Sequence, residues 1–284
     1  MRTLENKVIV ITGAGSGFGR ALALEVASLK AIPILLDVND KGLADTATAL
    51  AAQGSRFASH KLDVRDVAQW ATVVDAVIAE FGHADVLVNN AGVMCRPESF
   101  LDVAEDHGRF IFDVNFWGML HGMRAFAPHL ARQAEANIVN VASTLALIGT
   151  PMHGVYCASK AAVASLTAVV RQELAGTSIS VSTVFPGPSK TNLGANVPVD
   201  SEEKRRQNAA NFDKFAFTPP EAVAKKIVSA IRRNRALVTT SPDGAFTQVM
   251  QRLTPVGGHA LMNKVYRKVS DPVQFASLAR LKAS

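Results

Sequence analysis

A glycine-rich turn between an apolar run and a helix-forming run constrains the fold more than any other feature of the sequence. Residues 7–12, Lys-Val-Ile-Val-Ile-Thr, are of the β-branched, apolar kind that is buried in parallel sheets. Glycine then alternates with other residues over 12–19, and an alanine- and leucine-rich run follows from Arg20. Small residues at such a turn allow close approach of the backbone, and free N–H groups at a helix N-terminus face an anion. The stretch therefore predicts a cradle for a diphosphate.

A carboxylate follows the second expected strand. The apolar run 32–36 ends at Asp37, roughly 20 residues beyond the turn, where an acidic residue hydrogen-bonds the hydroxyls of an adenosine ribose. A carboxylate there would repel a 2′-phosphate, and neither Ser16 nor Val38 supplies a positive charge to attract one. The sequence therefore favours NAD over NADP. The alternative interpretation is that Asp37 is an ordinary strand-end or turn residue.

Strand and helix patterns alternate along most of the chain. A helical pattern at 41–52 is followed by a strand pattern at 56–62, a helical pattern at 67–81 and a strand pattern at 85–89. This rhythm predicts a parallel sheet with helices on both faces. Further expected elements are a helix over 106–130, strands over 137–141 and 179–184, a helix over 155–175, a helix from Pro219 to about Arg233 and a strand over 236–240.

Composition places these elements in one α/β domain over residues 1–284. With 48% hydrophobic and 19% charged residues, the chain can bury one large core without a second domain. The C-terminal extension, from about 241, contains two roughly amphipathic runs at 245–253 and 260–268. Three roles are open for it: covering a pocket, packing in a subunit interface or core, or contact with a membrane surface. The cofactor half covers about 5–150, and the catalytic and substrate half about 137–240.

Charge and cysteine content argue against several other classes of protein. The formal charge is +6, but the basic residues lie in separate short groups, which favours solvated helix faces over nucleic-acid binding. Cys95 and Cys157 have no C-x-x-C spacing and no histidine cluster beside them, so neither a disulfide framework nor a metal site is expected. The sequence has no apolar run near the ~20 residues that span a bilayer. Its first residues lack the pattern of a signal peptide, so a cytoplasmic location is expected.

Tyr156 and Lys160 give the sharpest chemical signal. They lie four residues apart in a helical pattern and therefore share one face of the helix. A fixed positive charge favours the phenolate and lowers a tyrosine pKa from its usual ~10, which would make Tyr156 a general acid/base. Ser143 follows an expected strand, and its hydroxyl would hold a substrate oxygen opposite Tyr156. Alternatively, the two are an ordinary helix pair and Ser143 a loop residue.

Together these motifs resemble the short-chain dehydrogenase/reductase family. The resemblance covers residues 5 to about 240 and implies a single Rossmann-type, doubly wound domain. It also implies a catalytic tetrad in which Tyr156 exchanges a proton with the substrate oxygen and Ser143 positions that oxygen. Lys160 would bind the nicotinamide ribose and lower the pKa of Tyr156, while Asn115 would support the proton relay. The motifs, in chain order, are Thr12-Gly13-x-x-x-Gly17-x-Gly19, Asp63, Asn89-Asn90-Ala91-Gly92, Asn115, Ser143, Tyr156-x-x-x-Lys160 and Pro186-Gly187.

The expected cofactor contacts extend along the whole sheet edge. Asp63, at the end of a strand, would meet the adenine amino group, and Thr191 would bind the nicotinamide carboxamide. Ser189 departs from the family pattern, which usually has an apolar residue there. The full expected set is Thr12, Gly13, Gly15, Ser16, Gly17, Phe18, Gly19, Asp37, Asp63, Val64, Asn90, Ala91, Gly92, Tyr156, Lys160, Pro186, Gly187, Ser189 and Thr191.

A long irregular stretch, 192–218, is expected to cover the substrate, as long loops in compact domains often do. The expected substrate contacts are Ser143, Tyr156, Leu145 and Met152. An apolar pocket would also include Val93, Met94, Leu147, Phe212, Phe215 and Phe217, although some of these side chains would equally suit the core.

We therefore expect an NAD-dependent oxidoreductase that interconverts a secondary alcohol and a ketone. The substrate would be apolar, such as a lipid, steroid or aromatic alcohol. The resemblance implies a homodimer or homotetramer built through the helices at 106–130 and 155–175. Two alternatives are an NADPH-dependent carbonyl reductase and a nucleotide-sensing binding protein without turnover.

Overall fold

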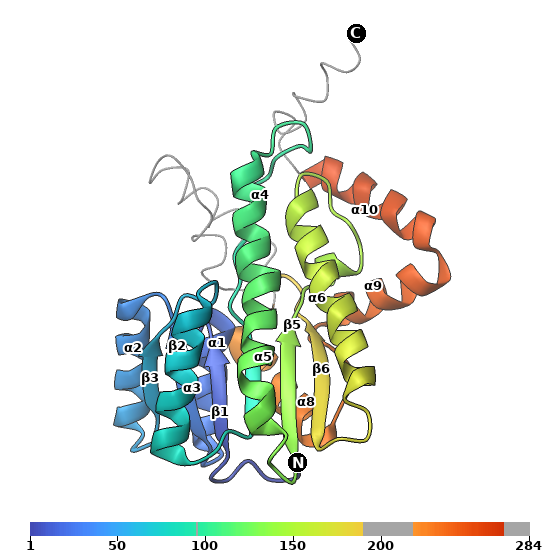
Figure 1. The fold of residues 1–284 in the computed structure, drawn as a ribbon. Helices are drawn as coiled ribbons and strands as arrows, with labels where there is room; N and C mark the ends of the chain where they lie inside the picture. The colour runs from blue at the N-terminus through green and yellow to red at the C-terminus, as the bar shows by residue number, and fades with distance from the viewer. Residues whose placement is uncertain (95, 190–217, 270–284) are drawn as a thin grey trace.

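The structure, a computed structural model, describes residues 1–94, 96–189 and 218–269. Seven strands in this part of the chain form one sheet in the order β3-β2-β1-β4-β5-β6-β7, and all neighbouring pairs are parallel (Figure 1). This confirms the predicted doubly wound α/β fold. The strands are β1 Val8–Thr12, β2 Ile32–Asp37, β3 Ala58–Lys61, β4 Val86–Asn89, β5 Ala136–Val141, β6 Ile179–Phe185 and β7 Leu237–Thr239.

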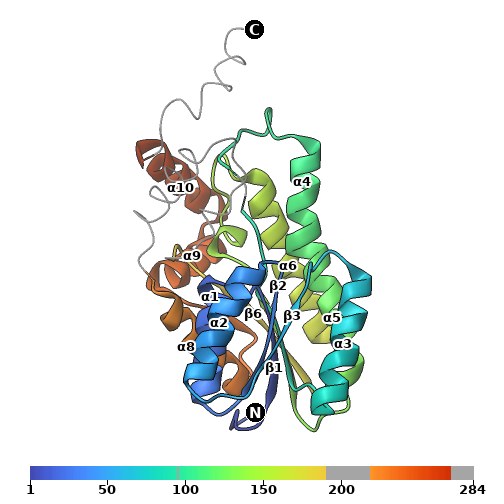
Figure 2. The same ribbon diagram turned by 90° about the vertical axis from the view of Figure 1, so that its left-hand side faces the viewer.

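Helices cover both faces of the sheet (Figure 2). One layer consists of α1 Gly17–Ser28, α2 Asp40–Ala52 and α8 Pro220–Arg233, and the other of α3 Val67–Phe81, α5 Gly118–Leu130 and α6 Gly154–Glu173. Every residue of β1, β4 and β5 is buried, because both faces of these central strands are covered. The chain order reverses between β1 and β4, and in such sheets ligands bind beside this point, beyond the carboxyl ends of the strands.

The helical stretch expected over 106–130 is confirmed, and it contains a π-helical turn. It consists of α4 Glu105–Phe112, a π-helical turn η1 Asp113–Trp117, and α5. Inside the turn, Asn115 bonds Val93: its Oδ1 accepts from the Val93 N–H at 2.8 Å, and its Nδ2 donates to the Val93 carbonyl at 3.0 Å. Single π-helical turns occur often at functional sites. The π-helical turn was not predicted, because hydrophobic spacing does not report this contact with a distant loop.

Both amphipathic runs of the C-terminal extension are helical, in α9 Pro242–Leu253 and α10 Pro255–Val269. The extension packs beside η2, a short 3-10 helix at Thr144–Ala146: a Cβ atom added to Gly244 would lie 2.8 Å from the Thr144 side chain. Among the described residues, no helix is both long enough and apolar enough to cross a bilayer.

Candidate active site

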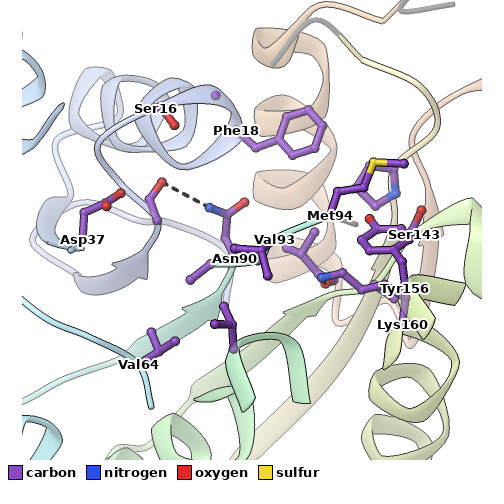
Figure 3. Close-up of a pocket in the computed structure, with 18 of the residues that line it drawn as sticks. Ser16, Phe18, Asp37, Val64, Asn90, Val93, Met94, Ser143, Tyr156 and Lys160 are labelled. Atoms are coloured by element: carbon purple, nitrogen blue, oxygen red, sulfur yellow. Dashed lines mark hydrogen bonds between the residues drawn. The ribbon is translucent and has the colours of Figure 1, made fainter. Parts of the chain in front are cut away.

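A cavity of about 730 Å³ lies at the carboxyl ends of the strands (Figure 3). Segments that follow six different strands contribute to its walls, so residues far apart in the sequence meet there. The lining includes Gly13 and Gly15–Phe18 after β1, Asp37–Asn39 at the end of β2, Asp63–Arg65 after β3, Asn90–Met94 after β4, Val141–Leu145 at the end of β5 and Pro186–Ser189 after β6, with Phe110, Val114, Tyr156 and Lys160.

The glycine turn is packed so closely that side chains would not fit. A Cβ atom at Gly19 would lie 2.1 Å from the carbonyl oxygen of Gly13, and one at Gly15 would lie 2.9 Å from the Asp37 carboxylate. Gly13 itself has a φ of +68°, a conformation that favours glycine. Ser16 precedes α1 but its side chain does not cap the helix, and the first turn of α1 has no acidic residue. The backbone N–H groups at the start of α1 therefore have no side-chain cap, and they suit a phosphate.

Thr12 and Asn90 join the ends of β1 and β4 beneath the turn. The Thr12 hydroxyl oxygen accepts from the backbone N–H groups of Asn90 and Ala91, each at 2.9 Å. The Asn90 Nδ2 donates to the Thr12 carbonyl at 2.8 Å. Asn90 and Ala91 line the cavity, whereas Thr12 and Gly19 lie behind its lining. Thr12 and Gly19 therefore shape the cradle from beneath.

Asp37 faces the turn from the end of β2. Its Oδ2 accepts from the Gly15 N–H, and its Oδ1 from the Asn39 N–H, each at 2.9 Å. Among the described residues that line the cavity, the cationic side chains are Arg65 and Lys160, and neither is bonded to Asp37. Lys61 lies beside Asp37 in the β2–β3 register, but its ammonium pairs with Asp40 at 2.6 Å. Among the described residues, no cationic side chain is hydrogen-bonded to the Asp37 carboxylate.

Asp63 lines the cavity, but its carboxylate already has a partner. Arg65 donates to both oxygens from its side chain, and this bond is the main reason that the pKa of Asp63 lies below its usual value. Sequence reasoning missed Arg65, although its position two residues after a predicted site carboxylate was a signal. It also missed Phe110, Val114 and Thr144, which line the same cavity from α4, η1 and η2.

Tyr156 and Lys160 enter the cavity from the first two turns of α6. Tyr156 is buried and packs against Met94 and Ile111. The Lys160 ammonium donates to the Val141 carbonyl at 3.0 Å, and burial lowers its pKa to about 8. A Cβ atom at Gly92 would lie 3.1 Å from both Lys160 Nζ and Asn115 Oδ1. Glycine at position 92 therefore leaves room in front of the ammonium group.

Ser143 lies at the same end of the cavity, and Asn115 lies behind it. The Ser143 Oγ accepts from the Leu145 N–H at 3.2 Å and so caps η2. Asn115 is buried, bonded to Val93 and to the Ser159 hydroxyl, and does not line the cavity. The structure thus brings three members of the expected tetrad together at the cavity wall. Asn115 contacts the loop that forms that wall.

The other expected substrate and cofactor residues fall into three groups: those that line the cavity, those that do not, and those outside the described residues. Val93, Met94 and Leu145 line the cavity, as do Pro186, Gly187 and Ser189 of the cofactor set. Met152 and Leu147 do not: Met152 is buried, has a φ of +65°, and its carbonyl accepts from the Glu98 N–H at 2.8 Å. The remaining predicted positions, Thr191, Phe212, Phe215, Phe217 and Cys95, lie outside the described residues.

Comparison with known proteins agrees with this geometry. A family model described as short chain dehydrogenase matches residues 7–202. The chain is 37% identical over 256 residues to SadH of Mycobacterium tuberculosis, a protein named as an oxidoreductase, with 89% of this chain and 92% of that protein covered. It is 33% identical over 237 residues to the 3-oxoacyl-(acyl-carrier-protein) reductase FabG of Thermotoga maritima, with 83% and 94% covered. A solved structure of a short-chain dehydrogenase/reductase from Burkholderia phymatum in complex with NAD has a TM-score of 0.82 and 31% identity, with 96% of this chain and 99% of that chain covered.

Proposed function

Because the chain belongs to the short-chain dehydrogenase family, we propose that it uses NAD to interconvert a secondary alcohol and a ketone. It is an oxidoreductase that acts on CH–OH groups. The observation that carries the finer proposal is the shape of the cavity. A glycine cradle lies at one end, and Ser143, Tyr156 and Lys160 meet at the other (Figure 3).

The residues present suit a nicotinamide dinucleotide. The glycines of the cradle, Gly13, Gly15 and Gly19, leave no room for a side chain, and the start of α1 offers backbone N–H groups to a diphosphate. Asp37 would accept from the adenosine ribose hydroxyls and repel a 2′-phosphate, which favours NAD. Lys160 would donate to the nicotinamide ribose, and a contact from Thr191 to the nicotinamide carboxamide stays a prediction. When bound, NAD supplies the hydride acceptor for the alcohol carbon, and its reduced form supplies the donor for the ketone.

Tyr156 would carry the proton. Lys160 is mostly protonated at neutral pH, since its pKa is about 8, and a nearby ammonium favours the phenolate of Tyr156. The phenolate would take the proton of the substrate hydroxyl during oxidation, and the phenol would return it during reduction. The Ser143 oxygen accepts from the Leu145 N–H, which leaves its O–H to donate to the substrate oxygen. Asn115 would support the proton relay from behind Val93.

The walls near Tyr156 favour an apolar substrate. Val93, Met94 and Leu145 line this end of the cavity, so we propose a lipid, steroid or aromatic alcohol. Reduction of a 3-oxoacyl group is a second candidate, since a relative at 33% identity is named for that reaction. Dependence on NADPH and a nucleotide-sensing role without turnover are the two alternatives to this proposal. We also propose that the protein is a cytoplasmic homodimer or homotetramer.

The test is nicotinamide absorbance with NAD or NADP and a panel of apolar secondary alcohols and their ketones. We expect turnover with NAD and at least about tenfold weaker binding of NADP, equivalent to about 1.4 kcal/mol. Asp37→Asn should reduce this preference. Asp45→Asn, which changes an exposed carboxylate on α2 that pairs with Lys41 and does not line the cavity, should leave it unchanged. Equal affinity of the wild type for both dinucleotides would contradict the role of Asp37.

A further inference from the structure

The outer side of α9 carries a row of exposed apolar side chains. Phe246, Val249 and Leu253 recur at i, i+3 and i+7, a spacing that places them on one side of the helix. Phe246 is 60% exposed and Leu253 is 73% exposed. Thr247 and Gln251, on the opposite side of α9, are half-buried. Soluble proteins rarely expose a row of this kind unless it meets a partner or a membrane.

The exposed surface continues onto α10, and the two helices project from the side of the domain (Figure 1). Val256, at the start of α10, is 83% exposed. Gly258 faces the domain, because a Cβ atom added there would lie 3.5 Å from the Ile148 side chain. Lys264 and Arg267 lie on the side of α10 away from Gly258, and both are exposed. Apolar side chains therefore dominate α9 and the start of α10, and cations follow along α10.

The charge of this hairpin has one sign. No aspartate or glutamate occurs between Asp243 and Asp271. Arg252 is exposed beside the apolar row of α9, and Lys264 and Arg267 are exposed on α10. Helices that lie on membranes combine an apolar face with lysine and arginine in this way, since the apolar groups enter the acyl boundary while the cations meet anionic headgroups. The hairpin is thus complementary to an anionic lipid surface.

The same charge argues against a second copy of the chain on this face. In a two-fold dimer through the hairpin each patch would meet itself, so the exposed cations of both copies would come together. Residues 244–269 contain no carboxylate that would pair with them. Like charges placed together in an interface weaken it. The anionic cytoplasmic face of a bilayer, in contrast, attracts every one of these cations.

We propose that the α9–α10 hairpin docks on an anionic lipid bilayer, with the apolar row of α9 inserted and the cations of both helices at the headgroups. The hairpin packs against η2, since a Cβ atom at Gly244 would lie 2.8 Å from the Thr144 side chain. Thr144 and Leu145 of η2 line the cavity. Docking would therefore hold this wall of the cavity beside the lipid, which suits an apolar alcohol. That consequence rests on the proposed function, whereas the docking itself does not.

The experiment is sedimentation of the full chain with lipid vesicles, in the absence of nucleotide and substrate. One set of vesicles is phosphatidylcholine alone, and the other is equal parts of phosphatidylcholine and phosphatidylglycerol. We expect binding to the mixed vesicles and at least about tenfold weaker binding to the neutral ones. The reason is that each lysine or arginine near an anionic surface contributes about fivefold in affinity.

Leu253→Ser tests the apolar row. Binding to the mixed vesicles should weaken by at least about fivefold, because the inserted leucine is lost. The variant should unfold at the wild-type Tm, since this side chain is exposed. Val67→Ser is the matched control: Val67 is also an exposed apolar residue at a helix surface, but it lies on α3. The control should bind the mixed vesicles as the wild type does.

Lys264→Gln combined with Arg267→Gln tests the cations. Binding to the mixed vesicles should weaken by at least about tenfold, because two charges at the headgroups are removed. The matched control is Lys225→Gln combined with Lys226→Gln, which removes two exposed lysines from α8. This control should keep the wild-type affinity.

Two results with the wild type would overturn the inference: no binding to the mixed vesicles, or equal binding to the neutral ones. Wild-type affinity in Leu253→Ser would overturn it as well. A smaller oligomer in Leu253→Ser, measured by light scattering, together with unchanged vesicle binding, would identify a second copy as the occupant instead. Because the assay contains no nucleotide or substrate, none of these outcomes bears on the proposed NAD-dependent turnover.

Discussion

The glycine turn and the buried end of α6 lie at opposite ends of one cavity, yet their polar groups are stabilised very differently (Figure 3). Around the turn, Thr12, Asn90 and Asp37 each bond backbone groups of neighbouring segments. At the other end, Lys160 is buried with a carbonyl as its hydrogen-bond acceptor, and burial alone accounts for its lowered pKa. The cradle therefore stabilises the fold, while the catalytic end retains a charge that destabilises it. Active sites often hold such groups at the expense of stability.

Lys160→Met should remove the destabilising charge, and it gives the largest expected change in turnover. The variant keeps the shape of the side chain but removes the charge that favours the Tyr156 phenolate, so turnover should fall by about 10²–10⁴-fold. The unfolding free energy at pH 7 should rise by about 2 kcal/mol. The shift from 10.5 to about 8 corresponds to about 3 kcal/mol, and the unpaired Val141 carbonyl offsets part of it. Urea unfolding at pH 7 measures the change.

The pH dependence of that gain follows from the direction of the shift. The folded-state pKa of Lys160 lies below its unfolded value, so the unfolded chain binds more protons between about 8 and 10.5. Wild-type stability from this group therefore rises with pH across that window, and the advantage of Lys160→Met should shrink there. Lys7→Met is the control of opposite sign, since it removes the partner of Oδ1 of the buried Asp85 and leaves only the Val8 N–H and His83 contacts to Oδ2; it should destabilise the fold by about 1–3 kcal/mol. A less stable Lys160→Met variant at pH 7 would contradict the comparison.

Gly19→Ala probes the other end and should have a smaller effect. The added Cβ would lie 2.1 Å from the Gly13 carbonyl oxygen, so the backbone of the turn must move. Overpacking of this kind costs about 1–3 kcal/mol, which predicts NAD binding weaker by about 5–150-fold. Calorimetric titration with NAD measures it.

Gly154→Ala is the matched control for that variant. Its Cβ would meet no atom within 4 Å, and it lies in the first turn of α6, where its φ is not positive. The control should bind NAD as the wild type does. Equal affinities for Gly19→Ala and Gly154→Ala would show that the close packing of the turn is not what shapes the cradle.

Local patterns predicted the sheet and the position of the cradle because both depend on short runs. The β-branched residues of β1 and the glycines after it are consecutive in sequence, and their roles follow from steric properties. Contacts between distant segments were not predictable in the same way. The bond between Asn115 and Val93 accompanies a π-helical turn, and Phe110 meets Arg65 across two elements. Such contacts depend on tertiary packing, which no spacing rule reports.

The central claim is that Tyr156 carries the proton while the cradle binds the cofactor, and Tyr156→Phe separates these two roles. The measurement pairs nicotinamide absorbance during turnover with calorimetric NAD binding, for the wild type and this variant. Phenylalanine keeps the ring that packs against Met94 and Ile111, so the fold and the Kd for NAD should be retained. Turnover should fall by about 10²–10⁴-fold. Turnover near the wild-type rate in Tyr156→Phe, with NAD still bound, would contradict the account.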